Sequence, residues 1–481
     1  MFVISFLRII SILLAIVGVS YIIPIITALC YGEYSVILPF VIPMLASFVF
    51  LVAMNLPFRK QKINLKTKTA FITVAGSWIF ASLFGALPLY FSGAIPSFTD
   101  ACFESVSGFS TTGSTILSEI ESLPRSINMW RCETHWLGGM GIVTLTVAIL
   151  PLLGVGGFQL IKAETTGPEK GKVTARITTT AKILWLIYFA FTITEMFLLK
   201  IAGMDWCDAL MHSLSTLGTG GFSSRNSSIG SYNSAAIDII ISVFMFLAGI
   251  NFSLFYYIII GKIADVKTNS EFKAYIGIVL IFSILIAFFI MPVYHNFGTS
   301  MRYSVFQVLA IITTSGYSTA DFLTWPATAQ FLLFILFFVG GCSGSTGGGV
   351  KVIRWVILFK QLNNETKRML HPHGVFTVRL NGRVGRKDIV FNVAAFMVMY
   401  IILIAITTLC GCFAKLDLFS AFTGAITMVG NVGPGFGQLG PSSNFGFLPG
   451  FLKWIYCFAM LAGRLELYTM IIFFMPSYWK K

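Results

Sequence analysis

The chain has 481 residues, of which 56% are hydrophobic and only 11% are charged. Soluble domains average about 25% charged residues, so this composition excludes a water-soluble globular protein and predicts an integral membrane protein. The 33 Lys and Arg residues outnumber the 19 Asp and Glu residues. In a membrane protein such an excess concerns the placement of loops relative to the bilayer, and we expect no nucleic-acid partner.

Ten long apolar segments are candidates for spanning helices, since a helix needs about 20 residues to cross a bilayer. In chain order they are 9–28, 36–56, 70–91, 136–153, 183–202, 235–261, 275–294, 327–359 with an interruption, 389–412 and 451–474. They are too long and unbroken for the strands of a transmembrane barrel. The predicted fold class is therefore an all-α integral membrane protein.

Shorter, moderately apolar stretches lie between several of these segments, and each ends in a glycine loop. The four glycines are Gly113, Gly221, Gly316 and Gly433, which lie 108, 95 and 117 residues apart. Stretches of this length cannot cross the membrane and suit re-entrant helices. The pattern predicts a fourfold repeat of helix, short helix, glycine loop and helix. We expect an N-terminal helix hairpin and four pore repeats, at 1–57, 58–165, 166–266, 267–372 and 373–481.

Basic residues predict the orientation of the chain. With a cytoplasmic N-terminus and re-entrant short helices, 25 Lys and Arg residues fall on the inner side, seven fall on the outer side, and Arg464 lies within a span. Cytoplasmic loops retain basic residues, so both termini are expected in the cytoplasm and the glycine loops on the outer side. Acidic residues on the outer side would form either a negative mouth or simple solvated charges. They are Glu33, Asp100, Glu104, Glu119, Glu121, Glu133, Asp205, Asp208, Asp238, Asp321 and Asp417.

The glycine loops suggest a cation site. Irregular backbone at membrane depth is tolerated only where protein or a water-filled cavity surrounds it. Glycine can adopt positive φ and turn carbonyl oxygens toward a shared axis, where they replace the hydration shell of a cation. The expected filter takes three residues from each repeat: Thr111, Thr112 and Gly113; Thr219, Gly220 and Gly221; Thr314, Ser315 and Gly316; and Asn431, Val432 and Gly433.

With its four glycine loops, the segment 135–143, the stretch 148–168 and the N-terminal hairpin, the chain resembles the Trk/Ktr/HKT superfamily of potassium transporters, and specifically its bacterial TrkH/TrkG branch. The resemblance implies gated potassium uptake across a bacterial inner membrane, by a homodimer with one pore per subunit. It places one filter glycine in each repeat. It also implies a cytosolic TrkA-type regulatory subunit. We expect no cofactor in this chain, so that ATP, ADP or NAD would bind only to that partner.

A second glycine cluster lies in the third repeat, where residues 340–349 include six glycines between apolar arms. Each glycine costs about 1 kcal/mol relative to alanine in a helix, so this stretch is expected to unwind within the membrane. It does not complete a phosphate-binding loop, because Val350 and Val352 break that motif. The resemblance implies an intramembrane gate beside an arginine of the last repeat. The expected gate residues are Gly344, Ser345, Thr346, Gly347, Gly348, Gly349, Lys351 and Arg464.

Several alternatives stay open at this point. Arg464 could instead form a local pair with Glu466, and Lys351 could be an anchor at the membrane interface. Glu195 lies within a predicted span, which allows a proton- or sodium-coupled symporter that uses the same pore, with Glu195 or an outer carboxylate as the coupling site. His371 and His373 could form a metal pair, although a solvated turn fits them better without a third ligand.

Two further expectations concern covalent chemistry. Cys102 and Cys132 fall on the same side of the predicted topology and could form a disulfide, although the eight cysteines show no framework spacing. We find no arrangement of nucleophile, base and orienting group in the sequence. The chain is therefore expected not to be an enzyme.

Overall fold

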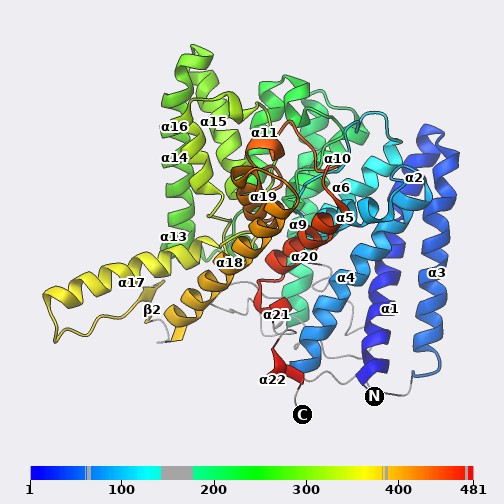
Figure 1. The fold of residues 1–481 in the computed structure, drawn as a ribbon, viewed down its shortest axis with the longest axis horizontal. Coiled ribbons are helices and arrows are strands. Elements are labelled where there is room, and N and C mark those ends of the chain that lie inside the picture. The colour runs from blue at the N-terminus through cyan, green and yellow to red at the C-terminus, as the bar shows by residue number, and fades with distance from the viewer. Residues whose placement is uncertain are drawn as a thin grey trace.

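The computed structural model describes residues 2–59, 61, 67–141, 177–381, 383–384, 388–471 and 475–479, and these are mainly helical (Figure 1). The chain begins with a hairpin of α1 (Phe2–Ser20), α2 (Ile22–Tyr31) and α3 (Ile37–Asn55). Helix α1 packs against α3 and α4, which joins the hairpin to the first repeat. Strands β1 (Arg379–Leu380) and β2 (Arg383–Val384) form a small antiparallel ladder that pairs Arg379 with Val384.

The rest of the described chain is a fourfold succession of long helix, short helix and further helix. Repeat 1 has α4 (Thr67–Phe91), α5 (Phe98–Phe109) and α6 (Arg125–Gly139). Repeat 2 has α9 (Ile177–Ile201), α10 (Trp206–Gly218), α11 (Ala235–Ala248), α12 (Phe252–Ile259) and α13 (Ile263–Thr268). Repeat 3 has α14 (Ser270–Tyr294), α15 (Phe297–Ile312), α16 (Ala327–Leu336) and α17 (Val352–Leu370). Repeat 4 has α18 (Asp388–Phe413), α19 (Leu418–Gly430) and α20 (Gly450–Arg464), followed by α21 (Tyr468–Ile471) and α22 (Pro476–Trp479).

The same local chemistry starts each short helix. A side-chain oxygen accepts a hydrogen bond from a backbone N–H in the first turn, which satisfies one of the unpaired donors at a helix start. The capping residues are Ser97, Asp205, Asn296 and Asp417. Before each cap, one residue with positive φ turns the chain back from the long helix, namely Gly93, Gly203, His295 and Lys415. The long helix packs against the short one in every repeat.

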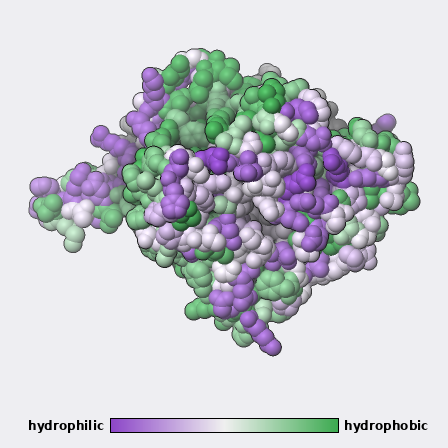
Figure 2. Space-filling view, turned by 90° about the horizontal axis from the view of Figure 1, so that it is seen from above, coloured by the Kyte–Doolittle hydropathy of each residue, from purple (hydrophilic) through white to green (hydrophobic). Residues whose placement is uncertain are grey.

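The outer helices present apolar side chains on the surface of the molecule. Val49 of α3 is 70% exposed, Phe288 of α14 is 58% exposed and Phe391 of α18 is 77% exposed. Within the described residues, six helices are long and apolar enough to cross a membrane, or seven if the bent pair α11 and α12 is one span. Seen from above, hydrophilic residues lie across the middle of the molecule and a broad apolar area lies along one edge (Figure 2). The all-α membrane fold is thus as predicted.

Three predicted spans differ from the observed helices. The segment 235–261 is bent by 91° between α11 and α12, because Asn251 caps a new helix. The helix expected at 451–474 ends at Arg464. Glu466 and Leu467, two and three residues later, have positive φ. The helix expected to begin at residue 136 begins at Arg125. Its first three turns contain many polar residues, so they do not read as a membrane span, but they are buried in the protein. The rest of that predicted span, and the stretch 148–168, lie outside the described residues.

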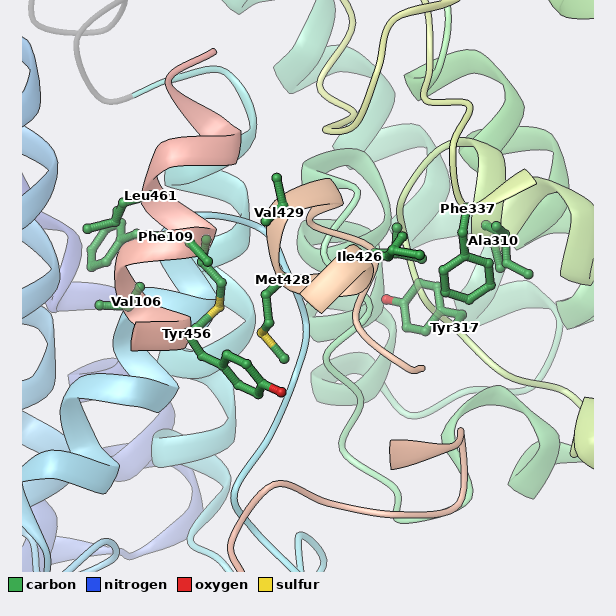
Figure 3. Close-up of a cluster of buried hydrophobic side chains, with 14 of the residues drawn as sticks. Val106, Phe109, Ala310, Tyr317, Phe337, Ile426, Met428, Val429, Tyr456 and Leu461 are labelled. Atoms are coloured by element: carbon green, nitrogen blue, oxygen red, sulfur yellow. The ribbon is translucent and has the colours of Figure 1, made fainter. Parts of the chain in front are cut away.

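The unwinding predicted in repeat 3 is observed, since no helix connects α16 to α17. Apolar side chains pack around the central loops and hold the short helices together. Figure 3 shows this cluster, with Val106 and Phe109 of α5 near Leu461 of α20 and with Tyr317 near Phe337. All five side chains belong to one buried core. Burial of these apolar side chains stabilises the packing of the repeats against one another.

Candidate functional site

The four glycine loops share one backbone conformation. In each loop a residue with φ between 54° and 59° is followed, two positions later, by a glycine with φ between 68° and 104°. The first set is Thr111, Thr219, Thr314 and Asn431, and the second is Gly113, Gly221, Gly316 and Gly433. Glycine adopts positive φ without the steric cost that a side chain brings. The four loops that align in sequence therefore also share one backbone conformation.

The loops also contact one another in a closed order. A Cβ built on Gly113 would fall against the carbonyl oxygen of Gly220, and one on Gly221 would fall against that of Ser315. The same holds for Gly316 against Val432 and for Gly433 against Thr112. Each repeat therefore approaches the next, and the fourth returns to the first. The twelve predicted filter residues come together as one ring, in which a side chain at any of the four glycines would collide with backbone.

Hydrogen bonds reinforce the junction between the fourth and first repeats. Asn431 donates from Nδ2 to Thr112 Oγ1 at 2.9 Å and to the carbonyl of Met460 at 2.9 Å. Ser114 donates to the carbonyl of Gly433 at 2.9 Å. Asn431 stands where the other three loops have threonine. Its amide connects the repeats, since it reaches both the first loop and α20.

His135 supports the second loop, a role that sequence reasoning missed. Its ring stacks on Phe222 with centroids 4.1 Å apart, and its Nδ1 lies 2.9 Å from Ser215 Oγ. The ring also fills the space where a side chain of Gly220 would project. The only sequence signal was the position of His135 at the start of the stretch used for the family resemblance.

A buried ion pair lies behind the first loop. Arg131 Nη2 lies 2.7 Å from Glu104 Oε1, and both side chains are fully buried. Glu104 also accepts hydrogen bonds from Thr115 Oγ1 at 2.8 Å and from Ile116 N at 3.0 Å. The carboxylate therefore links the short helix α5, helix α6 and the chain that leaves the first glycine.

The prediction that the outer acidic residues are mouth or loop charges is wrong for several of them. Glu104, Glu133, Asp208 and Asp238 are all at most 5% exposed. Glu33 accepts hydrogen bonds from two backbone N–H groups at the start of α6, so it caps that helix from the N-terminal hairpin. Glu33, Glu104 and Asp238 have partners on other helices, which a scan for charged loops cannot detect.

The unwound segment between α16 and α17 contacts the ring directly. Gly348 donates its N–H to Thr314 Oγ1 at 2.6 Å. A Cβ at Gly348 would lie 2.7 Å from the carbonyl oxygen of Gly430, so the segment also approaches the fourth loop. Lys351 is 3% exposed and donates from Nζ to the carbonyl of Gly347. Its alternative role as an interfacial anchor is therefore wrong, because the ammonium is folded into the segment itself.

Arg464 joins this segment to the first repeat. Its Nη1 donates to the carbonyl of Thr346 at 2.6 Å, and its Nη2 donates to the carbonyls of Gly138 at 2.6 Å and Gly139 at 2.8 Å. Glu466, the alternative partner, forms an ion pair of 2.6 Å with Arg354 of α17. A guanidinium with a planar fork of donors suits such a set of backbone acceptors. The contacts with α6 were not predicted.

The bend between α11 and α12 receives the same segment. A bend frees backbone groups that need new partners when they are buried. Cys342 donates its N–H to the carbonyl of Gly249 at 2.9 Å, and Thr346 Oγ1 donates to the carbonyl of Ala248 at 3.2 Å. In return, Phe252 donates its N–H to the carbonyl of Gly344 at 3.1 Å. Repeats 2, 3 and 4 therefore all hold the segment in place.

The remaining candidates lie apart from the ring. His371 and His373 are exposed, and the described residues contain no group of three side chains able to hold a metal ion. Cys102 and Cys132 are buried free thiols, so the disulfide prediction is wrong. Glu195 is fully buried in α9 and lies next to Thr216, without a well-formed hydrogen bond to any described residue.

This fold and its ring define a class of protein: a membrane transport protein built from four pore-type repeats. The family model of TrkH, described as a cation transport protein, matches residues 39–294 and 290–481. The chain is 40% identical over 483 residues to the Trk system potassium uptake protein TrkH of Halomonas elongata, covering 99% of each chain. It is 33% identical to the Trk system potassium uptake protein TrkG of Escherichia coli, covering 95% of this chain and 94% of the relative.

The crystal structure of the potassium transporter TrkH from Vibrio parahaemolyticus superposes with a TM-score of 0.87 at 35% sequence identity, and the match covers all of both chains. The chain therefore belongs to the TrkH family of cation transport proteins. The relatives are transport proteins and not enzymes, which confirms that expectation from the sequence.

Proposed function

We propose that this chain takes up potassium across the inner membrane of a bacterium, with both termini in the cytoplasm. The observation that carries the proposal is the closed ring of four glycine loops. Curated relatives of the chain are named potassium uptake proteins, which favours potassium as the transported ion. Potassium ions bind along the ring, at the twelve filter residues from Thr111 to Gly433 named above. Glycine is needed in each loop because the neighbouring backbone leaves no space for a side chain.

The unwound segment acts as the gate in this proposal. It lies against the ring through the bond between Gly348 and Thr314, and Arg464 holds it from the last repeat. Transport then requires the segment to move away from the ring. The contacts with the bend at Gly249 make such a movement depend on the arrangement of α12.

Regulation and assembly complete the proposal. A second copy of the chain and a cytosolic TrkA-type partner, which carries ATP, ADP or NAD, bind at the inner side. Helix α17 projects away from the body of the molecule (Figure 1). It exposes Phe359 by 65% and Leu362 by 62%, and its last turn is basic at Lys367 and Arg368. This combination supplies apolar area for another subunit and charge for a cytosolic protein.

A proton- or sodium-coupled symporter is the second candidate, and Glu195 is the observation that favours it. A carboxyl group buried within a membrane helix is costly and commonly functional. Glu195 packs beside the short helix of repeat 2, which leads directly into the second loop. In this alternative the same ring carries the potassium, and Glu195 binds the coupling ion.

Growth of a bacterium without its own potassium uptake systems tests the proposal. Expression of the chain should restore growth at low external potassium, and Gly316→Ser should weaken the rescue at equal protein levels. Absence of rescue together with absence of Rb⁺ uptake by the purified protein in liposomes would reject the proposed function.

A further inference from the structure

Glu271, in the first turn of α14, lies at the base of the unwound segment. Its side chain is buried, with the residue 6% exposed. A single carboxylate oxygen, Oε1, accepts two backbone hydrogen bonds, from Ser343 N at 2.6 Å and from Ile353 N at 3.1 Å. Ser343 lies midway along the unwound segment, which runs from 337 to 351, and Ile353 lies in the first turn of α17. One atom therefore holds both ends of the stretch 343–353, which contains the contacts to Thr314 and Arg464.

These two bonds are favourable for separate reasons. Ile353 is among the first residues of α17, whose N–H groups have no partner within the helix, and a carboxylate there also interacts well with the helix dipole. Ser343 lies in irregular backbone that needs a partner when it is buried. Hydrogen bonds to an ionised acceptor are roughly twice as strong as neutral ones. The carboxylate thus stabilises a conformation in which the segment returns sharply on itself.

We propose that Glu271 is a positioning residue that pins the two ends of the stretch 343–353 and so sets how far the tip of the unwound segment obstructs the ion path. The inference rests on the proposed function of that segment as a gate. Glu271 holds the base from α14, whereas Arg464 holds the tip from α20 through Thr346. Backbone hydrogen bonds from Gly340 N to Val350 O at 2.9 Å and from Val352 N to Gly341 O at 3.2 Å also close the base. Loss of Glu271 therefore loosens the base without unpairing it, and the tip leaves the ring more readily.

Variants of Glu271 distinguish the effect of its charge from the effect of its side-chain length. Glu271→Ala removes the acceptor, and Rb⁺ flux without any cytosolic partner should rise about tenfold, as expected for a lost hydrogen bond to a charged group. Glu271→Gln keeps a carbonyl oxygen with two lone pairs at the same distance but loses the charge that strengthens both bonds, so its flux should rise by less than that of Glu271→Ala. Glu271→Asp keeps the charge but is shorter, and should fall between Glu271→Ala and the wild type. Asp265→Ala, an exposed carboxylate on α13, is the matched control.

The native cysteines report on the segment directly. Cys342 lies within the segment and is 1% exposed, whereas Cys102 and Cys457, at 0% and 4% exposed, lie elsewhere in the core. We would treat purified protein in liposomes with N-ethylmaleimide and measure the modification of each cysteine by mass spectrometry. Glu271→Ala should accelerate modification of Cys342 alone. Modification of all three cysteines would instead indicate that the variant is unfolded.

The outcomes are distinguishable. Faster labelling of Cys342 and higher flux in Glu271→Ala, with smaller increases in Glu271→Gln and wild-type values in Asp265→Ala, support the inference. Wild-type labelling and flux in Glu271→Ala overturn it. If Glu271→Ala unfolds, Glu271→Asp decides: intermediate values support the inference, and wild-type values overturn it. If the wild type carries no Rb⁺, the proposed function fails, but the labelling of Cys342 still shows whether Glu271 pins the segment.

Discussion

If the unwound segment gates the ring as proposed, replacement of Arg464 by alanine should increase ion flux, because it removes a tie that holds the segment against the ring. Among the described residues the guanidinium donates three hydrogen bonds, and the bond to Thr346 O, at 2.6 Å, is the one that reaches the segment. The two bonds to Gly138 and Gly139 join α20 to α6 and are available whether the segment is in place or not. In the proposed gate, the described contact that the closed state loses is therefore the bond to Thr346.

A hydrogen bond to a charged group contributes about 1.5–3 kcal/mol net. Removing it should shift the ratio of open to closed protein by a factor of about 10 to 150. Arg464→Lys should give an intermediate flux, since lysine keeps the charge but lacks the planar fork that serves Thr346 and α6 together. Rb⁺ uptake into liposomes at equal protein content measures these effects, and thermal unfolding of the same samples serves as the folding control. A lower flux for alanine with wild-type flux for lysine would show that Arg464 supplies only a charge needed for folding.

Three further changes test other parts of the structure. Gly316→Ser should raise sodium flux relative to Rb⁺ flux, because φ is 68° and the added Cβ meets the next loop, whereas Gly277→Ser has open space and should leave the ratio unchanged. Glu104→Ala should cost about 3–5 kcal/mol in thermal unfolding by leaving Arg131 buried and unpaired, and replacing both residues by methionine should cost less than that single change. Hydrogen bonds from the hydroxyl and the backbone N–H of Ser420 lower the pKa of Asp417. The ionised Asp417 side chain therefore contributes to folding stability above about pH 4, and this contribution is lost as the pH falls through the lowered pKa. Asp417→Ala should unfold at a lower temperature at neutral pH, with a deficit that shrinks in acid; a deficit independent of pH would contradict this.

Much of the repeated architecture could be predicted from the sequence, because it depends on local chemistry. A short apolar stretch that ends in glycine is too short to span, and it recurs four times at similar spacing. The unwound segment follows from the density of glycine between 340 and 349. In both cases the residues that dictate the backbone lie next to one another in the chain.

The contacts that hold the site together depend on residues far apart in sequence. Glu104 pairs with Arg131 on another helix, and Glu271 reaches residues 72 and 82 positions away. In a membrane chain such charges resemble loop residues until the partner is known. The start of α6 was missed for the same reason, because its polar residues are buried by neighbouring helices and not by lipid. Only Gly249 and Asn251 signalled the bend in repeat 2, within an otherwise apolar run.

The reversal potential of the purified protein in liposomes tests the central claim most directly. With a potassium gradient in one direction and a proton gradient in the other, the current through the wild type should reverse at the potential set by potassium alone. Gly316→Ser should move the reversal potential toward that of sodium when sodium is added. A reversal potential that follows the proton gradient and returns to the potassium value in Glu195→Gln would contradict passive uptake through the ring and establish coupled transport.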